Sequence, residues 1–277
     1  IVSGSVKYNV VNNALSGPIT RFVEDSAILL EALSGFSTEG EYITINENSL
    51  GSKIESNNKK FKIGFSKTIG GASLETKISE VVQSSVLKYQ NEFNAQVDEI
   101  NFYPESIEEI YDVFFDWFCT KGYASDPELI DNPEIKSKAT DYLVRNWEHG
   151  KKVSGSRLFE CYNKIGYYRD YMNNFFENYD FLITPTMATT SFVVDNPPEE
   201  INSKKVNDKL WDFTPFTYYF NLTGNPAATI PVGFDDSKMP IGLQIVGKMG
   251  REIDVFKISK EFEQIFKWYE YRADTSI

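Results

Sequence analysis

The chain has 277 residues, of which 41% are hydrophobic and 15% aromatic. Such a composition can bury a sizeable core, which argues against an intrinsically disordered protein. The formal net charge is −12, from 40 acidic and 28 basic residues, so we expect neither nucleic acid nor a membrane surface as a partner. No apolar run approaches the roughly 20 residues of a membrane-spanning helix. The N-terminus lacks the basic start and apolar stretch of a signal peptide, which predicts a cytoplasmic protein, and the missing initiator methionine predicts a fragment or a processed chain.

The two cysteines limit the redox and metal chemistry of the chain. Cys119 and Cys161 each lie in a pattern with helical periodicity, which predicts buried free thiols rather than a disulfide. No Cys-x-x-Cys pair occurs, so no metal site is predicted.

The first part of the chain predicts one helix followed by a β-α-β unit. We expect a helix over 21–34, capped by Thr20 and stopped by Gly35, and then a polar connector over 36–60. Alternating apolar residues predict a strand over 61–65, helical spacing predicts a long amphipathic helix over 78–93, and a second strand follows over 97–102. Strand, helix and strand in this order favour parallel pairing.

The rest of the chain predicts further helices and three more strands. Helices are expected from about residue 104 to 118, over 135–148 and over 156–177, with a break at 126–133. A strand over 180–184 stops at Pro185, and the segment 187–206 reads as irregular. Strands over 227–232 and 241–246 and a last helix over 252–268 complete the chain. Without repeats or a clear linker, residues 1–277 are predicted to form a single α/β domain.

Common catalytic constellations are missing from the sequence. A Ser-His-Asp triad needs a histidine base, and the single candidate, His149, sits at a predicted helix end, where a solvated histidine is typical. Gly-x-Ser-x-Gly and the glycine-rich phosphate loops are absent. Adjacent carboxylates such as Glu108 and Glu109 point in different directions and favour solvated charge over a glycosidase pair.

Three segments carry an order of residues that no rule of periodicity demands. They are GPITRFVED at 17–25, FENYDFLITPT at 176–186 and the segment 213–248, which runs FTPFTYYFNLTGNPAATIPVGFDDSKMPIGLQIVGK. In order and spacing they resemble the amidase signature family across essentially the whole chain. The resemblance implies an α/β fold with a central mixed β-sheet flanked by helices on both faces, and it implies no cofactor.

The resemblance also implies an activity whose machinery this chain lacks. Amidase signature enzymes hydrolyse amides with a nucleophilic Ser, a second Ser in a cis peptide and a Lys, and backbone N–H groups form the oxyanion hole. In the family these groups precede the element that begins here at Gly17. Ser3, Ser5 and Ser16 lack the required context, so no catalytic residue is assigned. We therefore expect the C-terminal part of an amidase, inactive alone.

What the matching part of the family contributes is the far wall of an acyl pocket. The candidate residues are Thr184, Thr186, Met187, Phe216, Thr217, Phe220, Asn221 and Gly224. Each also has a structural interpretation: Phe216 and Phe220 are i,i+4 partners that suit a core, and Asn221 and Gly224 suit a turn. If the pocket interpretation holds, Phe216, Phe220 and Met187 converge near the end of the 180–184 strand.

Two alternatives stay open beside the amidase. The corresponding subunit of the glutamyl/aspartyl-tRNA amidotransferase resembles the same segment but usually has an Asp where this chain has Thr214, and Asp212 is out of register by two. The other alternative is a non-catalytic interaction protein derived from an amidase. The expected partners are a small-molecule amide in the full-length enzyme and either an N-terminal half or a second copy, which would cover an apolar face and open sheet edges.

Overall fold

The computed structural model describes residues 2–3, 15–36, 42–43, 54 and 60–272. Its centre is a five-stranded sheet in the order β10-β11-β7-β5-β6. The strands are β5 (Lys62–Phe65), β6 (Gln96–Glu99), β7 (Phe181–Pro185), β10 (Ala227–Phe234) and β11 (Pro240–Gly247). β5 runs parallel to β6 and β7, whereas β11 runs antiparallel to β7 and β10. The sheet is therefore mixed, as predicted.

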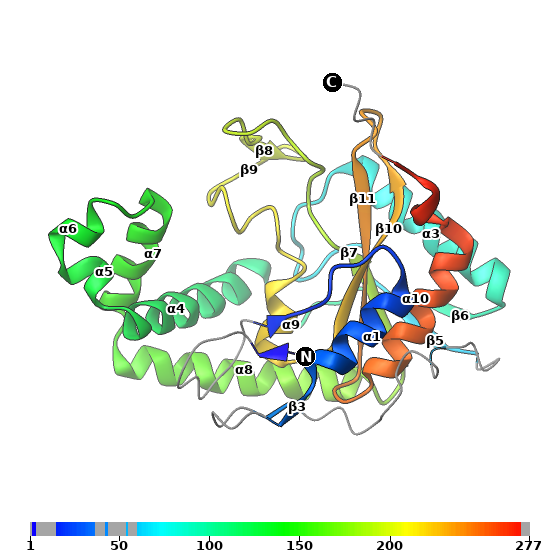
Figure 1. Cartoon of the computed structure of the whole chain (residues 1–277), viewed down its shortest axis with the longest axis horizontal. Coiled ribbons are helices and arrows are strands. Elements are labelled where there is room, and N and C mark those ends of the chain that lie inside the picture. The colour runs from blue at the N-terminus through cyan, green and yellow to red at the C-terminus, as the bar shows by residue number, and fades with distance from the viewer. Residues whose placement is uncertain (1, 4–14, 37–41, 44–53, 55–59, 273–277) are drawn as a thin grey trace.

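Helices cover both faces of this sheet (Figure 1). On one face, α3 (Thr76–Phe93) and α10 (Glu252–Phe266) lie side by side, since Tyr89 stacks on Phe262 with ring centroids 4.4 Å apart. On the other face lie α8 (Gly155–Phe175) and α9 (Tyr218–Thr223). Phe175 packs so closely on β5 that a Cβ at Gly64 would lie 2.9 Å from its ring. The predicted layers are confirmed.

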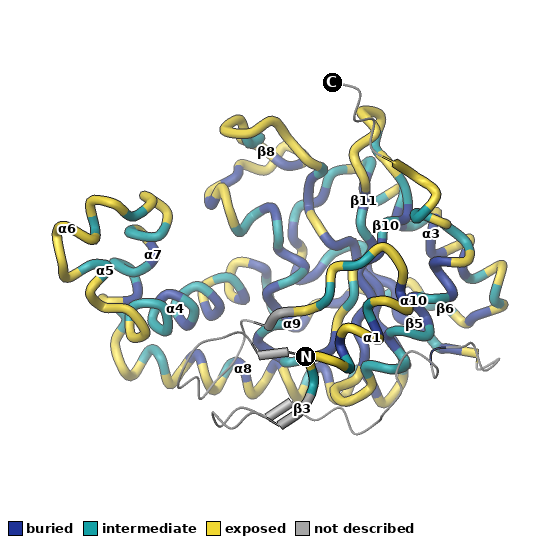
Figure 2. The backbone as a smooth tube through the Cα atoms, in the orientation of Figure 1, coloured by how far each residue is buried: buried dark blue, intermediate teal, exposed yellow. Residues whose placement is uncertain are grey.

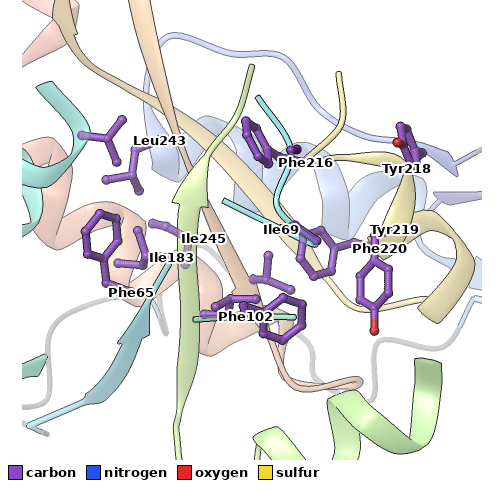
Figure 3. Close-up of a cluster of buried hydrophobic side chains, with 14 of the residues drawn as sticks. Phe65, Ile69, Phe102, Ile183, Phe216, Tyr218, Tyr219, Phe220, Leu243 and Ile245 are labelled. Atoms are coloured by element: carbon purple, nitrogen blue, oxygen red, sulfur yellow. The ribbon is translucent and has the colours of Figure 1, made fainter. Parts of the chain in front are cut away.

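Alternation along the strands sorts the side chains between the two faces. Leu243 and Ile245 of β11 and Ile183 of β7 belong to the face covered by α3 and α10. Figure 3 shows Phe65 and Leu243 on one side of β7 and aromatic residues of the α9 region on the other. All of these side chains are buried in one hydrophobic cluster.

The predicted β-α-β unit is confirmed, and the helix after it has a cap that was not predicted. β5, α3 and β6 follow one another with parallel pairing. α4 (Ile107–Ser125) starts at Ser106, whose hydroxyl accepts from Glu109 N–H at 3.3 Å. The Ser106 hydroxyl also donates to the Glu109 carboxylate at 3.1 Å. The pattern Ser-x-x-Glu is that of a capping box.

A helical arm extends from α4 away from the sheet (Figure 1). It contains α5 (Glu128–Asp131), α6 (Pro133–Lys136) and α7 (Asp141–Lys152), and Figure 2 shows much of α5 and α6 exposed. The prediction of one helix over 135–148 is wrong. The Ser137 hydroxyl donates to the Glu134 carbonyl at 2.8 Å, and such a local bond closes a turn in competition with the helix.

The N-terminal helix α1 (Val23–Leu33) is anchored by a distant residue rather than by its predicted cap. The Thr20 hydroxyl donates to the Phe22 carbonyl at 2.7 Å and makes no cap. Instead, Val23 N–H donates to the buried carboxylate of Glu263 in α10 at 2.8 Å. Beyond α1, β3 (Gly35–Phe36) pairs with β4 (Tyr42–Ile43), and most of the predicted connector lies outside the described residues.

The segment before α1 is tied to the end of α10. The Arg21 guanidinium donates to the carbonyls of Tyr269, at 3.1 Å, and Tyr271. In return the Trp268 indole donates to the Arg21 carbonyl at 2.9 Å. Trp268 begins the short 3₁₀ helix η1 (Trp268–Glu270), which follows α10. The last predicted helix therefore ends near Phe266 rather than at residue 268.

The segment 187–206 was predicted to be irregular but contains a small hairpin. β8 (Glu200–Ile201) pairs antiparallel with β9 (Lys204–Lys205). The two turn residues, Asn202 and Ser203, have φ of 49° and 64°, as a two-residue hairpin turn of type I′ requires. Another short antiparallel pair joins β1 (Val2–Ser3) and β2 (Leu15–Ser16).

Within the described ranges, no helix has both the length and the apolar character that crossing a membrane requires.

Replacing Glu263 tests the anchoring of α1. Glu263→Ala removes the acceptor of Val23 N–H, and an unpaired buried donor costs about 1–3 kcal/mol of unfolding free energy. We expect a loss of that size in urea unfolding, together with faster amide exchange throughout α1. Glu92→Ala, at an exposed position on α3, is the matched control. Equal stability of the two variants would contradict the anchoring role.

Candidate functional site

A cavity of about 680 Å³ lies where β10 and β11 meet α9, α10 and the segment before α1. We call it the sheet-edge cavity, and its size is that of a small-molecule site. It is lined by Gly17, Pro18, Ile19, Thr20, Arg21, Phe22, Val23, Ser26, Leu30, Thr217, Phe220, Asn221, Asn225, Pro226, Ala227, Ala228, Thr229, Ile230, Pro231, Gln244, Glu252, Val255, Phe256, Ser259 and Trp268.

The floor of the cavity is held by a buried side-chain amide. Gln244 of β11 is 3% exposed, and its Nε2 group donates to Thr184 Oγ1 at 3.0 Å and to the Phe216 carbonyl at 2.7 Å. One bond reaches β7 and the other reaches the segment that leads into α9. The two bonds fix α9 against the sheet.

The wall of the cavity is the short helix α9 and its flanking turns. The Thr217 hydroxyl donates to the Thr214 carbonyl at 3.0 Å at its start. At its end, Gly224 has φ of 81° and its N–H donates to the Phe220 carbonyl at 2.8 Å. A left-handed residue at this position favours glycine. The helix thus presents Thr217, Phe220 and Asn221 to the cavity.

The other predicted pocket residues lie around this wall rather than on it. Thr184 is fully buried beneath Gln244. Thr186 donates from Oγ1 to Thr229 Oγ1 at 3.4 Å, and Thr229 lines the cavity. Phe216 is buried in the hydrophobic core, and Gly224 terminates the helix.

Met187 lies elsewhere. It is 37% exposed and lines a separate hollow of about 330 Å³ with Ile78, Phe192 and Gly242. Phe220 therefore faces the sheet-edge cavity while Met187 faces this smaller hollow, and the structure does not bring the two together in one cavity.

The sheet-edge cavity offers a binding surface but little that could activate a nucleophile. His, Lys, Cys and Asp are all missing from its described lining, and Glu252, at the start of α10, is the one carboxylate there. The hydroxyls of Thr20 and Ser26 bond to each other at 2.5 Å, and Ser259 donates to the Val255 carbonyl at 2.7 Å. The cavity can therefore hold an uncharged polar ligand, but it joins no nucleophile to a base.

A metal ion has no evident site in the part of the chain that the structure describes. Across these residues no cluster of His, Cys, Asp and Glu suits a metal ion.

Sequence reasoning assigned no role to two residues of this site, Gln244 and Thr229. The alternation of Leu243, Gln244 and Ile245 places the amide on the opposite face from its apolar neighbours, which is a usable signal. Thr229 has no comparable signal, because its exposure follows from the position of β10 at the edge of the described sheet.

The histidine and the cysteines take no part in the cavity. His149 lies in the last turn of α7, with Nε2 2.5 Å from Asp116 Oδ1. Cys119 and Cys161 are free and buried, as predicted. Burial raises the pKa of Cys119 from 9.0 to about 12 and that of Cys161 from 9.0 to about 11.

Comparison with known proteins gives matches along most of the chain. The family model Amidase matches residues 4–256. An acylamidase of Rhodococcus erythropolis is 25% identical over 269 residues, covering 96% of this chain and 55% of the relative. A glutamyl-tRNA(Gln) amidotransferase subunit of Listeria monocytogenes is 30% identical over 278 residues, covering 90% of this chain and 54% of the relative.

A solved structure agrees in fold. A bacterial aryl acylamidase of the amidase signature enzymes superposes with a TM-score of 0.80 at 24% identity, covering 91% of this chain and 54% of that one. The chain thus spans about half the length of the curated relatives it matches.

Removing the Gln244 amide tests how α9 is held. Gln244→Leu leaves the Phe216 carbonyl without its donor, so we expect the unfolding free energy to fall by about 1–3 kcal/mol. Gln264→Leu, at an exposed position on α10, is the control in the same denaturation experiment. A Gln244→Leu protein as stable as this control would show that the amide is dispensable.

The thiols should be unreactive in the folded chain. Their raised pKa values keep Cys119 and Cys161 protonated at mildly alkaline pH, where an ordinary thiol is partly ionised, and the thiolate is the reactive form. We expect a thiol-specific disulfide reagent to label both residues only after denaturant is added. Rapid labelling of the native protein would contradict the buried environment of the two thiols.

Proposed function

This chain belongs to the amidase family, and we propose that it forms one wall of the substrate pocket in an enzyme that hydrolyses linear amides. The observation that carries the proposal is the sheet-edge cavity. Three residues of the family-like segment, Thr217, Phe220 and Asn221, line it together. Because Gln244 fixes α9, this wall is rigid before any substrate binds, which lowers the cost of binding.

The chemistry of the cavity suits an uncharged acyl amide. Phe220 and Pro231 offer apolar contact, whereas Asn221 and Thr229 can exchange hydrogen bonds with a neutral carbonyl or amide. Arg21 is engaged with backbone carbonyls, so it is a poor receptor for phosphate. The proposed substrate is an uncharged small molecule, and the proposal includes no cofactor.

The nucleophile and its proton acceptors come from polypeptide outside these 277 residues under this proposal. Two observations support it: the described cavity lining lacks His, Lys and Cys, and the matched relatives are about twice as long. The isolated chain is then inactive, because binding without nucleophile and base yields little rate enhancement.

An exposed apolar surface on α1 is the proposed docking site for that polypeptide, or for a second copy of the chain. Ile28, Leu29 and Leu33 are 53%, 40% and 47% exposed, and Ile19 before the helix is 98% exposed. Adjacent exposed apolar residues of this kind are typical of an interface. The free thiols favour a reducing compartment, and we propose the cytoplasm.

We prefer the amidase to the amidotransferase subunit because of the residue at position 214. Thr214 has no charge with which to hold the amine of glutamine, and its hydroxyl donates to the Trp211 carbonyl at 3.3 Å. Asp212 accepts from the N–H groups of Asn207 and Asp208 at 2.7 and 3.1 Å, so it is occupied. The amidotransferase subunit, to which identity reaches 30%, stays the second candidate, and a non-catalytic interaction protein the third.

We expect the pure chain not to hydrolyse aryl amides or esters, and we expect activity when the remaining segment of the full-length enzyme is joined to it. Hydrolysis of an acyl anilide, followed by release of the aromatic amine, measures both. Steady hydrolysis by the chain alone, abolished by a serine-directed phosphonate, would overturn the proposal that the nucleophile lies outside these 277 residues.

Charged substitutions on α1 test the docking surface. Ile28→Asp with Leu33→Asp should leave the isolated fold intact, because both positions are exposed, but should prevent association measured by light scattering. The control is Leu87→Asp on α3, which is 53% exposed and lies away from α1. A monodisperse monomer that binds no apolar dye and no further segment would contradict the proposed surface.

A further inference from the structure

A second cavity, of about 480 Å³, lies between α4, α7 and the β8–β9 hairpin. We call it the hairpin cavity, and it shares no described lining residue with the sheet-edge cavity. Aromatic rings of Tyr111, Phe115 and Tyr218 form part of its wall. Its size is within the range of small-molecule sites, and the proposed amide hydrolysis makes no use of it.

Most of the charged groups in this cavity already have partners. Arg145 is paired with Asp208 at 2.9 Å, and Lys204 with Glu108 at 2.8 Å. Asp212 accepts two backbone N–H groups from the segment that follows the hairpin. These pairs shape the cavity but leave little charge for a ligand.

Two charged groups of opposite sign are left over. Asp112 of α4 and Lys205 of β9 line the cavity, are exposed, and have no ion pair within the described part of the chain. They therefore stand apart at the cavity surface instead of neutralising each other. Partial desolvation, and after it the neighbouring Asp116 carboxylate, raise the pKa of Asp112 against the opposing effect of Arg157 and His149, so a further cation beside Asp112 would favour its charged form.

Arg145 adds one donor on the side of the hairpin. Its Nε and Nη2 groups donate to Asn146 Oδ1 at 3.2 and 3.1 Å, and Nη2 also donates to Asp208. The guanidinium lies 5.8 Å from the ring centroid of Phe115. Nη1 has no hydrogen-bond partner among the described residues, so the paired guanidinium keeps one amino group for a ligand.

We propose that the hairpin cavity binds a small zwitterion, an amino-carboxylic acid with a spacer between its charges. The ammonium group pairs with Asp112, and the carboxylate accepts from Lys205 and from Nη1 of Arg145. The spacer lies against Tyr111 and Phe115. A polyanion is disfavoured, because the lining has three basic side chains against four acidic ones.

Binding of para-aminomethylbenzoate to the chain tests this proposal, with benzylamine and para-toluate as probes that each carry one of the two charges. Binding is followed by NMR titration of aromatic resonances and by calorimetry. We expect saturable binding of the zwitterion that shifts Phe115 and Tyr111, with both single-charge probes about tenfold weaker, as the loss of one charge-assisted contact implies.

Two variants and their controls assign the ends of the ligand. Asp112→Asn should weaken the zwitterion about tenfold but leave para-toluate unchanged, and Lys205→Gln should weaken both the zwitterion and para-toluate while leaving benzylamine unchanged. Asp170→Asn and Lys209→Gln, at exposed positions outside the cavity, should have no effect.

Three results would overturn the proposal. They are equal affinity for the zwitterion and for benzylamine, unchanged binding in Asp112→Asn, and the absence of any shift at Phe115. None of these readouts depends on amide hydrolysis.

Discussion

The position of α9 depends on one buried side-chain amide. Gln244 lies in the middle of β11, the strand that pairs antiparallel on both sides, and its Nε2 group reaches both β7 and the carbonyl of Phe216. A buried amide that lacked these acceptors would be costly. The sheet therefore dictates where α9 starts, and Gly224, with its left-handed conformation, dictates where it ends.

The same short helix divides two cavities of different chemical character. Thr217, Phe220 and Asn221 face the sheet-edge cavity, whose lining is almost entirely uncharged, whereas Tyr218 faces the hairpin cavity with its seven charged side chains. Successive residues of a helix point about 100° apart, so one turn of α9 serves both sites. A shift of this helix would alter the two cavities together.

Much of the fold could be predicted from local patterns, and the exceptions have physical causes. The strand at 61–65 and the helix α3 follow from periodicity, whereas the strand at 180–184 follows from a short apolar run, because every residue of β7 is buried. The anchor of α1 could not be predicted, since the carboxylate that accepts from Val23 N–H belongs to Glu263, 240 positions away. The β8–β9 hairpin has strands of two residues, too short for any periodicity, and only its Asn202 turn residue was a local signal.

The two cavities differ in how far the sequence could predict them. Thr217, Phe220 and Asn221 of the sheet-edge cavity lie in one contiguous segment that the family resemblance covers. The hairpin cavity needs α4, α7 and the β8–β9 hairpin in one place, and only long-range packing determines that arrangement.

The most direct measurement of the central claim is a map of where a neutral amide binds. Titration of the labelled chain with a non-hydrolysable acyl anilide analogue, read by NMR, should shift Thr217, Phe220 and Asn221 in parallel and leave Tyr111 and Phe115 unmoved. Two results would contradict a substrate wall built by α9. One is saturable shifts confined to another part of the chain. The other is the absence of shifts at these three residues in an assembled enzyme that hydrolyses the parent amide.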